Sequence, residues 1–218
     1  MIINFSHQKG GTGKSTIAYN LAEAYENMSF KTTILDLDIQ DTCLEYNSLR
    51  DTPKTNIVNI REDAQLIAAI ENASEDEIII IDSGGFDSSL TRLAIIGADI
   101  NITPIADKVS EILAITKKYS KILKEIEEAT QESITTYVLL NRIHIFAQNF
   151  EHLKAIIQPH KQMKMLNTII RDRGIYDKSL REGLTVQEAF SLKGHKDASH
   201  EIKKLGDELL TINKGKTK

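Results

Sequence analysis

Short apolar runs alternate along the chain with longer segments in which apolar residues recur every three or four positions. The runs predict strands at residues 1–6, 32–37, 55–60, 77–82, 99–103, 134–141 and 164–170. The periodic segments predict helices at residues 14–28, 42–50, 62–73, 88–97, 107–130, 148–160, 185–192 and 198–212. This alternation indicates an α/β fold, a doubly wound and mostly parallel sheet with helices on both faces and right-handed crossovers.

A glycine-rich segment joins the first predicted strand to the first predicted helix. It consists of Lys9, Gly10, Gly11, Thr12, Gly13, Lys14, Ser15 and Thr16. In this setting the backbone N–H groups and the helix N-terminus can surround a polyphosphate. Lys14 would neutralise the β- and γ-phosphates, and the Ser15 hydroxyl would ligate Mg²⁺. Gln8 replaces the first glycine of the usual phosphate-loop pattern. The alternative is a plain turn with solvated lysines, which the strand before it and the helix after it disfavour.

Carboxylates follow the second predicted strand. Asp36 and Asp38 stand at its carboxyl end, and strand alternation places them on the same side. Ligands bind at this edge of open α/β sheets, so both side chains are candidates for the same site as the glycine-rich loop. The alternative is that they are surface aspartates that cap a helix beginning near Thr42.

A run of four isoleucines at residues 78–81 predicts a strand that is buried on both faces. Asp82 ends this strand and would hold Mg²⁺ directly or through water. Gly84 and Gly85 follow, and their backbone freedom would let the segment swing toward the γ-phosphate as a switch. The alternative is an ordinary junction between a strand and a turn.

Residues 9–16 resemble the deviant Walker A box of the ParA/MinD ATPases, a family that includes nitrogenase iron protein and the arsenite-pump ATPase. The resemblance implies that Lys9 reaches across a dimer interface to the partner's nucleotide. Residues 36–40 resemble the family's Asp-x-Asp-x-Gln box, with Ile39 where proline is usual. By that match Asp38 orients the attacking water and Asp36 supports the magnesium shell. The implied catalytic residues are Lys9, Lys14 and Asp38, and the implied metal ligands are Ser15, Asp36 and Asp82.

Other segments extend the resemblance. The pair of glycines followed by Asp87 and Ser88 is similar to small plasmid-partition members, whereas many relatives carry proline there. Asn141 ends the predicted strand 134–141, and in relatives an asparagine at this tip contacts adenine, which implies ATP and not GTP. Asn141 is also a common type of residue at a strand-end turn. Residues 169–176 and 183–186 resemble the family's stretch near the base.

Composition is that of a globular protein with one domain. The chain has 218 residues, of which 41% are hydrophobic and 27% charged, and it lacks a linker-like tract. We therefore expect one ATPase domain over residues 1–212 and a polar, disordered tail at 213–218. A lone cysteine, Cys43, precludes an intrachain disulfide and suits a reducing cytoplasm. No apolar run approaches the roughly 18 residues that a membrane span needs.

Charge is distributed unevenly although the formal net charge is only −4. Residues 1–140 contain 12 Lys and Arg against 22 Asp and Glu, whereas residues 141–218 contain 15 against 9. The basic part predicts non-specific, salt-sensitive DNA binding. The candidates are Lys161, Lys164, Arg171, Arg173, Lys193, Lys196, Lys203 and Lys204. The alternative is a set of solvated faces and a frayed tail.

The last predicted helix carries an apolar stripe of Ile202, Leu205, Leu209 and Ile212. MinD-like relatives end in an amphipathic helix that lies on membranes. Here the polar face includes acids, and the helix has no Phe or Trp to insert, so we expect the stripe to pack on the protein's own sheet.

Together these features predict a ParA-like partition ATPase with slow intrinsic turnover. ATP and Mg²⁺ would join two subunits as a homodimer that binds DNA non-specifically. A ParB-like centromere-binding adaptor protein would stimulate hydrolysis and drive segregation of a plasmid, chromosome or mobile element. The expected location is the cytoplasm, on the nucleoid. The alternatives are a MinD-like membrane-associated positioning ATPase and a metabolic member that delivers metals or clusters. The absence of Cys-x-x-Cys disfavours the metabolic alternative.

Overall fold

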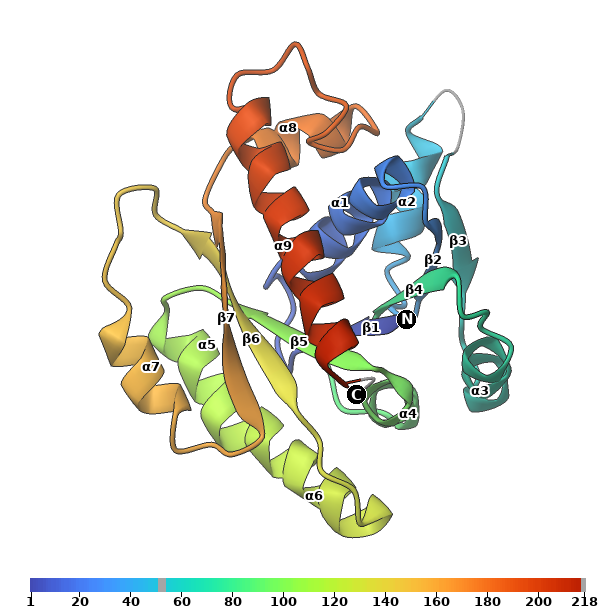
Figure 1. The fold of residues 1–218 in the computed structure, drawn as a ribbon, viewed down its shortest axis with the longest axis vertical. Coiled ribbons are helices and arrows are strands. Elements are labelled where there is room, and N and C mark those ends of the chain that lie inside the picture. Colours follow the sequence, from blue (N-terminus) through green and yellow to red (C-terminus); the bar gives the residue numbers. More distant parts are fainter. Residues whose placement is uncertain (51–53, 217–218) are drawn as a thin grey trace.

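Seven parallel strands form the central sheet of the computed structural model, which describes residues 1–50 and 54–216 (Figure 1). The strands are β1 (Ile2–Phe5), β2 (Lys31–Asp36), β3 (Asn56–Asn59), β4 (Glu77–Asp82), β5 (Ile100–Ile105), β6 (Thr136–Ile143) and β7 (Met163–Arg171). Their order is β3-β2-β4-β1-β5-β6-β7, and every neighbouring pair is parallel. Each strand falls where the sequence predicted one, so the predicted fold class is confirmed.

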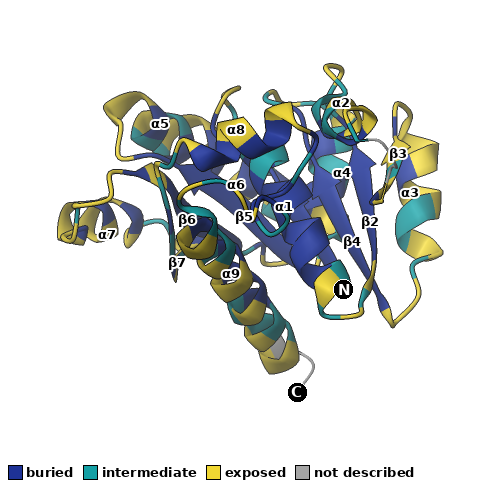
Figure 2. Cartoon of the chain, turned by 90° about the horizontal axis from the view of Figure 1, so that it is seen from above, coloured by how far each residue is buried: buried dark blue, intermediate teal, exposed yellow. Residues whose placement is uncertain are grey.

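Helices cover both faces of this sheet (Figure 2). They are α1 (Lys14–Asn27), α2 (Thr42–Ser48), α3 (Asp63–Glu71), α4 (Ser89–Gly97), α5 (Val109–Leu113), the π-helix η1 (Ala114–Tyr119), α6 (Ser120–Thr130), α7 (Glu151–Ile157), α8 (Ile175–Arg181) and α9 (His195–Lys216). Helices α1, α8 and α9 pack on one face, while α3, α4 and the continuous run from α5 to α6 pack on the other.

Strand alternation explains why β4 consists of isoleucines. Ile78 and Ile80 join the core beneath α1 and α9, whereas Ile79 and Ile81 join the core beneath α3 and α4. All four side chains are buried. A polar residue at any of these positions would therefore face a hydrophobic layer, as the sequence run predicted.

The predicted helix at 185–192 is wrong, and a helix that the sequence did not predict, α8, lies just before it. Gly183 has a φ of 68°, which stops α8. The Ala189 N–H then bonds to the Thr185 carbonyl and closes one turn, but the Phe190 N–H bonds to the Glu188 carbonyl, so the turn does not continue as a helix. Phe190 is 75% exposed, so the apolar residues of this segment do not share one face.

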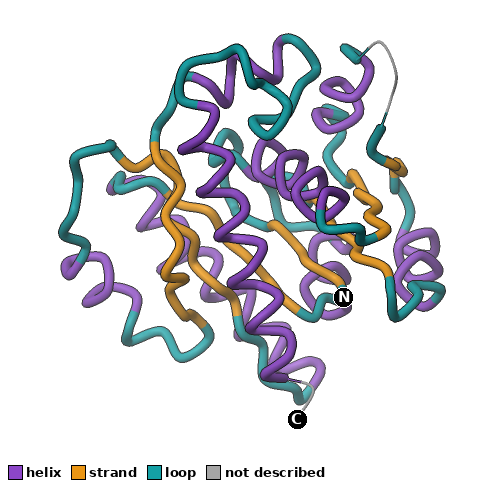
Figure 3. The backbone as a smooth tube through the Cα atoms, turned by 45° about the horizontal axis from the view of Figure 1, so that its top comes forward, coloured by secondary structure: helices purple, strands orange, loops and turns teal. Residues whose placement is uncertain are grey.

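Helix α9 crosses the sheet and ends four residues later than predicted (Figure 3). Residues 213–216 of the expected polar tail are therefore helical, and residues 217–218 lie outside the described residues. Ile202, Leu205 and Leu209 are completely buried against the core that includes α1 and β7. The stripe packs on the protein's own sheet, as expected. No described helix is both long and apolar enough to cross a membrane.

Candidate nucleotide-binding site

The glycine-rich loop connects β1 to α1 at the carboxyl edge of the sheet. Gly11 and Gly13 have φ values of 77° and 92°, a backbone region that side chains other than glycine rarely tolerate. Lys14 begins α1 and is only 5% exposed, whereas Lys9 and Gly10 are exposed. The loop therefore presents backbone N–H groups at a helix N-terminus, above a buried lysine. This arrangement is suited to bind a polyphosphate.

Two residues from the end of β6 brace the loop. The side-chain amide of Asn141 donates a 2.7 Å hydrogen bond to the carbonyl of Thr12, and Arg142 donates a 2.6 Å hydrogen bond to the carbonyl of Gly11. A Cβ atom on Gly13 would lie 2.5 Å from the Asn141 amide nitrogen. Position 13 therefore requires glycine for two reasons: its positive φ, and the lack of space for a Cβ atom beside Asn141.

His7 lies completely buried just before the loop. Its Nδ1 accepts a 2.9 Å hydrogen bond from the Lys9 backbone, and its Nε2 has no hydrogen-bond partner among the described residues. Burial, with a contribution from the Lys14 ammonium, lowers the pKa of His7 to about 4. The imidazole is therefore neutral near pH 7. His7 thus holds the backbone at Lys9, where the loop begins, without adding a positive charge.

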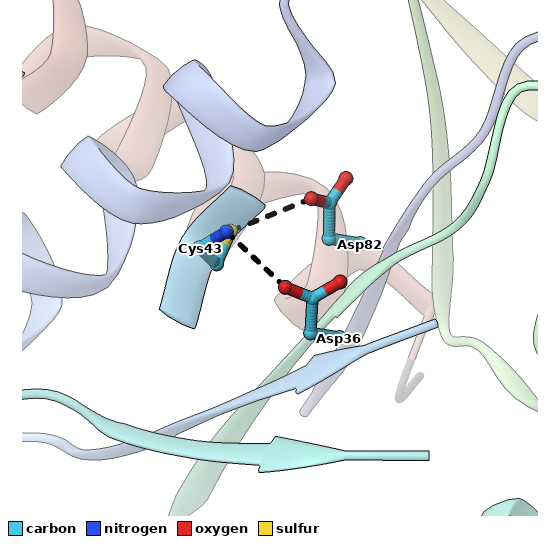
Figure 4. Close-up of side chains that lie close together, drawn as sticks. All are labelled: Asp36, Cys43 and Asp82. Carbon is cyan, nitrogen blue, oxygen red and sulfur yellow. Dashed lines mark hydrogen bonds between the residues drawn. The ribbon is translucent and has the colours of Figure 1, made fainter. Parts of the chain in front are cut away.

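Asp36 and Asp82 stand opposite one another at the ends of adjacent strands, and both are completely buried (Figure 4). The two carboxylate oxygens of Asp36 accept hydrogen bonds from the backbone N–H groups of Asp38 (3.0 Å) and Cys43 (3.1 Å). Burial raises the pKa of Asp36 above its usual range. The Cys43 thiol donates to Asp82 Oδ2 over 3.4 Å.

Asp82 has the chemistry of a metal ligand. Burial raises its pKa to about 7, against the opposing effects of the Ser15 hydroxyl and the Lys14 ammonium. Its Oδ1 has no hydrogen-bond partner among the described residues. A buried carboxylate oxygen without a partner is suited to accept a cation or a cation-bound water. The residues present thus fit the Mg²⁺ that the family resemblance implies. Ser15 and Asp82 would hold it, with Asp36 behind them.

The double glycine after β4 lies directly on the loop. A Cβ atom on Gly85 would come within 3.0 Å of the Gly10 nitrogen and 3.2 Å of the Gly10 Cα. The chain then passes the half-exposed Phe86 and enters α4, where the Ser88 hydroxyl accepts a hydrogen bond from the Thr91 backbone. Gly85 therefore leaves no room for a side chain beside the Gly10 backbone, and the switch role of this segment stays a prediction.

A cavity of about 620 Å³ opens beside the loop. Its walls include Gly13, Thr16, Asn141, Ile170, Gly174 and Tyr176. Pockets of this volume accept a drug-sized molecule or a nucleoside. Six residues of the predicted base-proximal stretch 169–176, namely 170–174 and 176, line this cavity. The structure places Asn141 at this cavity as well as against the loop, and its contact with adenine remains a prediction.

Residues 3–186 match the CobQ/CobB/MinD/ParA nucleotide binding domain family. The chain belongs to this family of ParA/MinD-type proteins. A curated relative, protein ParA of Rhizobium radiobacter, is 22% identical over 153 residues, which cover 69% of this chain and 68% of that protein.

Solved structures of the same type share the fold. MinD from Pyrococcus horikoshii OT3 in complex with Mg-ADP is 18% identical with a TM-score of 0.71, over 97% of this chain and 98% of that one. A McdA variant from Cyanothece in complex with ATP is 14% identical with a TM-score of 0.72, over 95% of each chain.

In this ParA/MinD-type chain Lys9 and Asp38 are more exposed than the buried carboxylates Asp36 and Asp82. The exposed Lys9 donates a 3.0 Å hydrogen bond from its ammonium to the Ser110 hydroxyl on α5. Asp38 is half-buried, and its Oδ1 accepts a 3.1 Å hydrogen bond from the Gln40 backbone. Both residues therefore lie on the outer side of the site, where they can face another molecule.

The candidate DNA-binding cations of this ParA/MinD-type chain fall into two groups. Arg171 donates to the carbonyls of His144 (3.1 Å) and Ala147 (2.7 Å), and Arg173 forms ion pairs with Asp197 and Glu201. These two arginines also line the cavity beside the loop. The six lysines are exposed: Lys161, Lys164, Lys193, Lys196, Lys203 and Lys204. DNA binding remains a prediction, and the lysines are its better candidates.

Sequence reasoning missed three contributors to this site. Arg142 and Ser110 bond to the loop from distant segments, and the sequence offers no signal for such pairings. His7 could have been noticed, because it lies between an apolar strand and the phosphate loop. A histidine is seldom completely buried, as His7 is here.

Proposed function

We propose that this protein is a ParA-type partition ATPase that cycles between a monomer and an ATP-bound dimer. The observation that supports the proposal is the different exposure of the two loop lysines, Lys14 and Lys9. Lys14 is buried at the start of α1, where it meets phosphates bound in its own loop. Lys9 is exposed and bonds only to the exposed Ser110 hydroxyl, so by exchanging that bond it could meet phosphates bound by a second subunit.

The proposed chemistry is attack of water on the γ-phosphate. Asp38 orients that water from the outer side of the site. Ser15 and Asp82 would hold Mg²⁺, which would supply positive charge at the phosphates. Lys14 and the partner's Lys9 would stabilise the charge that develops during transfer. Loss of the γ-phosphate removes contacts that exist only in the dimer, so hydrolysis opens it. The Gly85 contact with Gly10 would transmit this change to α4.

Binding of non-specific DNA and of a ParB-like adaptor completes the proposed cycle. Exposed lysines of the basic carboxyl-terminal part would neutralise DNA phosphates, so affinity should fall steeply with salt. The adaptor would stimulate hydrolysis and release the dimer from the nucleoid. The cargo would be a plasmid, a chromosome or another mobile element.

The buried stripe of α9 favours partition over membrane positioning. Leu205 and Leu209 are completely buried in the core, so adsorption of this face to lipid would require α9 to leave the sheet. Sedimentation with anionic liposomes in the presence of ATP checks this point. We expect the protein to stay in the supernatant.

Paired lysine variants test the proposal. Lys14→Ala should lose nucleotide binding, because the buried cation beneath the loop is gone. Lys9→Ala should retain nucleotide binding but lose ATP-dependent dimerisation and hydrolysis. Lys154→Ala, which removes an exposed lysine on α7, serves as the matched control and should behave as wild type. Normal dimerisation and turnover of Lys9→Ala would reject the trans role of Lys9.

A further inference from the structure

Three buried donor atoms meet beneath the phosphate loop. They are one carboxylate oxygen each of Asp36 and Asp82 and the sulfur of Cys43, and all three lie within 4.8 Å of one another (Figure 4). All three side chains are completely buried. The two carboxylates end adjacent strands, and the thiol comes from the first turn of α2. The unpartnered Oδ1 of Asp82 means that this cluster contains a desolvated acceptor, and a bound cation would compensate it.

The spacing agrees with a small tetrahedral ion. Metal–sulfur and metal–oxygen bonds of about 2.3 and 2.0 Å place the two ligands about 3.5 Å apart in tetrahedral zinc. The Cys43 sulfur and Asp82 Oδ2 are 3.4 Å apart. Asp36 Oδ2 is held beside them by the 3.1 Å hydrogen bond from the Cys43 backbone. All three donors lie within 4.8 Å of one another, so an ion bound among them would contact each after small side-chain movements.

The donor set also distinguishes among cations. Mg²⁺ takes oxygen ligands in an octahedron and keeps several waters, so a sulfur donor does not suit it. A thiolate with two carboxylates suits a thiophilic divalent ion. We propose that Asp36, Cys43 and Asp82 form a binding site for Zn²⁺ or a similarly thiophilic divalent cation. This site differs from the expected Mg²⁺ site in using the Cys43 sulfur instead of Ser15, and it shares Asp82, and Asp36 behind it, with that site.

Charge and protons balance at this site. When sulfur ligates the ion, the Cys43 thiol releases its proton to solvent. A thiolate and two carboxylates then carry three negative charges against the two positive charges of the ion. The Lys14 ammonium, buried at the start of α1, would offset the remainder. The Ser15 carbonyl oxygen, 3.7 Å from the sulfur, or a water is available near the fourth position.

Sharing of Asp82 gives the site a regulatory consequence. An ion held by Cys43 and Asp82 withdraws that carboxylate from Mg²⁺, so zinc and magnesium–nucleotide compete. Zinc would then keep the protein in its nucleotide-free form. The zinc site itself does not rest on ATP hydrolysis, because its three donors all belong to this chain.

The chain has a single cysteine, which makes the test direct. The probe is Cd²⁺, added to metal-stripped, nucleotide-free, full-length protein, and the readout is the ultraviolet charge-transfer absorption of a cadmium–thiolate bond. We expect this absorption to saturate at one equivalent, to be displaced by Zn²⁺, and to be absent in Cys43→Ser. Zinc affinity measured by calorimetry should fall at least about tenfold in Cys43→Ser and in Asp36→Asn.

Asp41→Asn is the matched control, since Asp41 is a nearby carboxylate that pairs with Arg61 outside the cluster. It should bind cadmium as wild type does. Should Asp36→Asn fail to fold, displacement of cadmium from wild type by magnesium–ADP tests the shared carboxylate instead. Absence of the absorption, or unchanged zinc affinity in Cys43→Ser, overturns the proposal. Failed ATP hydrolysis with intact cadmium binding would reject the ATPase proposal and leave this one standing.

Discussion

Substitution of Asn141 separates its brace of the phosphate loop from its predicted contact with adenine. In the structure its amide braces the phosphate loop through Thr12, at 2.7 Å, and it also lines the cavity beside the loop. Asn141→Ala removes the brace. Asn141→Asp replaces the donating nitrogen with an acceptor that faces the Thr12 carbonyl, so it should be at least as damaging as the alanine.

The expected magnitude follows from burial. Asn141 is 4% exposed and Thr12 is 2% exposed, so water cannot readily replace the lost donor. Leaving a buried carbonyl unsatisfied costs about 1–3 kcal/mol. If this cost falls on the loop conformation that binds phosphates, nucleotide affinity drops by about 5- to 150-fold. Because the brace acts on the loop and not on the base, ATP and GTP should lose affinity by the same factor.

Displacement of a fluorescent nucleotide analogue by ATP and by GTP measures both factors. Thermal unfolding of the nucleotide-free variant shows whether the fold survives. Arg142→Ala, which removes the more exposed brace to Gly11, should show a smaller loss for both nucleotides. A loss confined to ATP would refute the brace and support the adenine contact. No loss for either nucleotide would refute both roles.

Three further predictions concern the loop, its histidine and the core. Gly85→Ala places a Cβ 3.0 Å from the Gly10 nitrogen and should weaken binding of a non-hydrolysable ATP analogue about tenfold, measured by calorimetry. The pKa of His7 is about 4 in the folded protein and 6.5 in the unfolded chain. Its neutral form therefore contributes up to about 3 kcal/mol to the free energy of unfolding above about pH 6.5, and this contribution is lost as the pH falls toward about 4. His7→Asn should flatten that fall in urea unfolding, and an unchanged slope would contradict the burial argument. Leu205→Ala should destabilise by about 2–5 kcal/mol while exposed Lys204→Ala changes little, and equal midpoints in denaturant would contradict the packing of α9.

The fold was largely predictable because its strands are short, apolar and separated by regular helical segments. Each isoleucine of β4 has a hydrophobic layer on its own side, so local pattern and tertiary packing agree. The prediction failed at 185–192, where apolar residues have helical spacing but the backbone hydrogen bonds do not continue beyond the single turn that ends at Ala189. The sequence did not predict helix α8 because this helix has only seven residues between Gly174 and Gly183, too few to show a helical period.

The site was predictable only where one segment determines it. The loop from Lys9 to Thr16 and the strand-end aspartates carry their signal within a few residues. Asn141, Ser110 and His7 act through contacts with this loop, and each contact depends on where distant elements meet in the folded sheet. Cys43 was interpreted only as a sign of a reducing compartment, since nothing in the sequence places its sulfur beside Asp82.

The most direct test of the account is the mass of Asp38→Ala in magnesium–ATP, measured by size-exclusion chromatography with light scattering. This variant should bind ATP without cleaving it, so the account predicts an accumulated dimer that the additional change Lys9→Ala returns to a monomer. An Asp38→Ala protein that remains monomeric with saturating magnesium–ATP would contradict the proposed cycle.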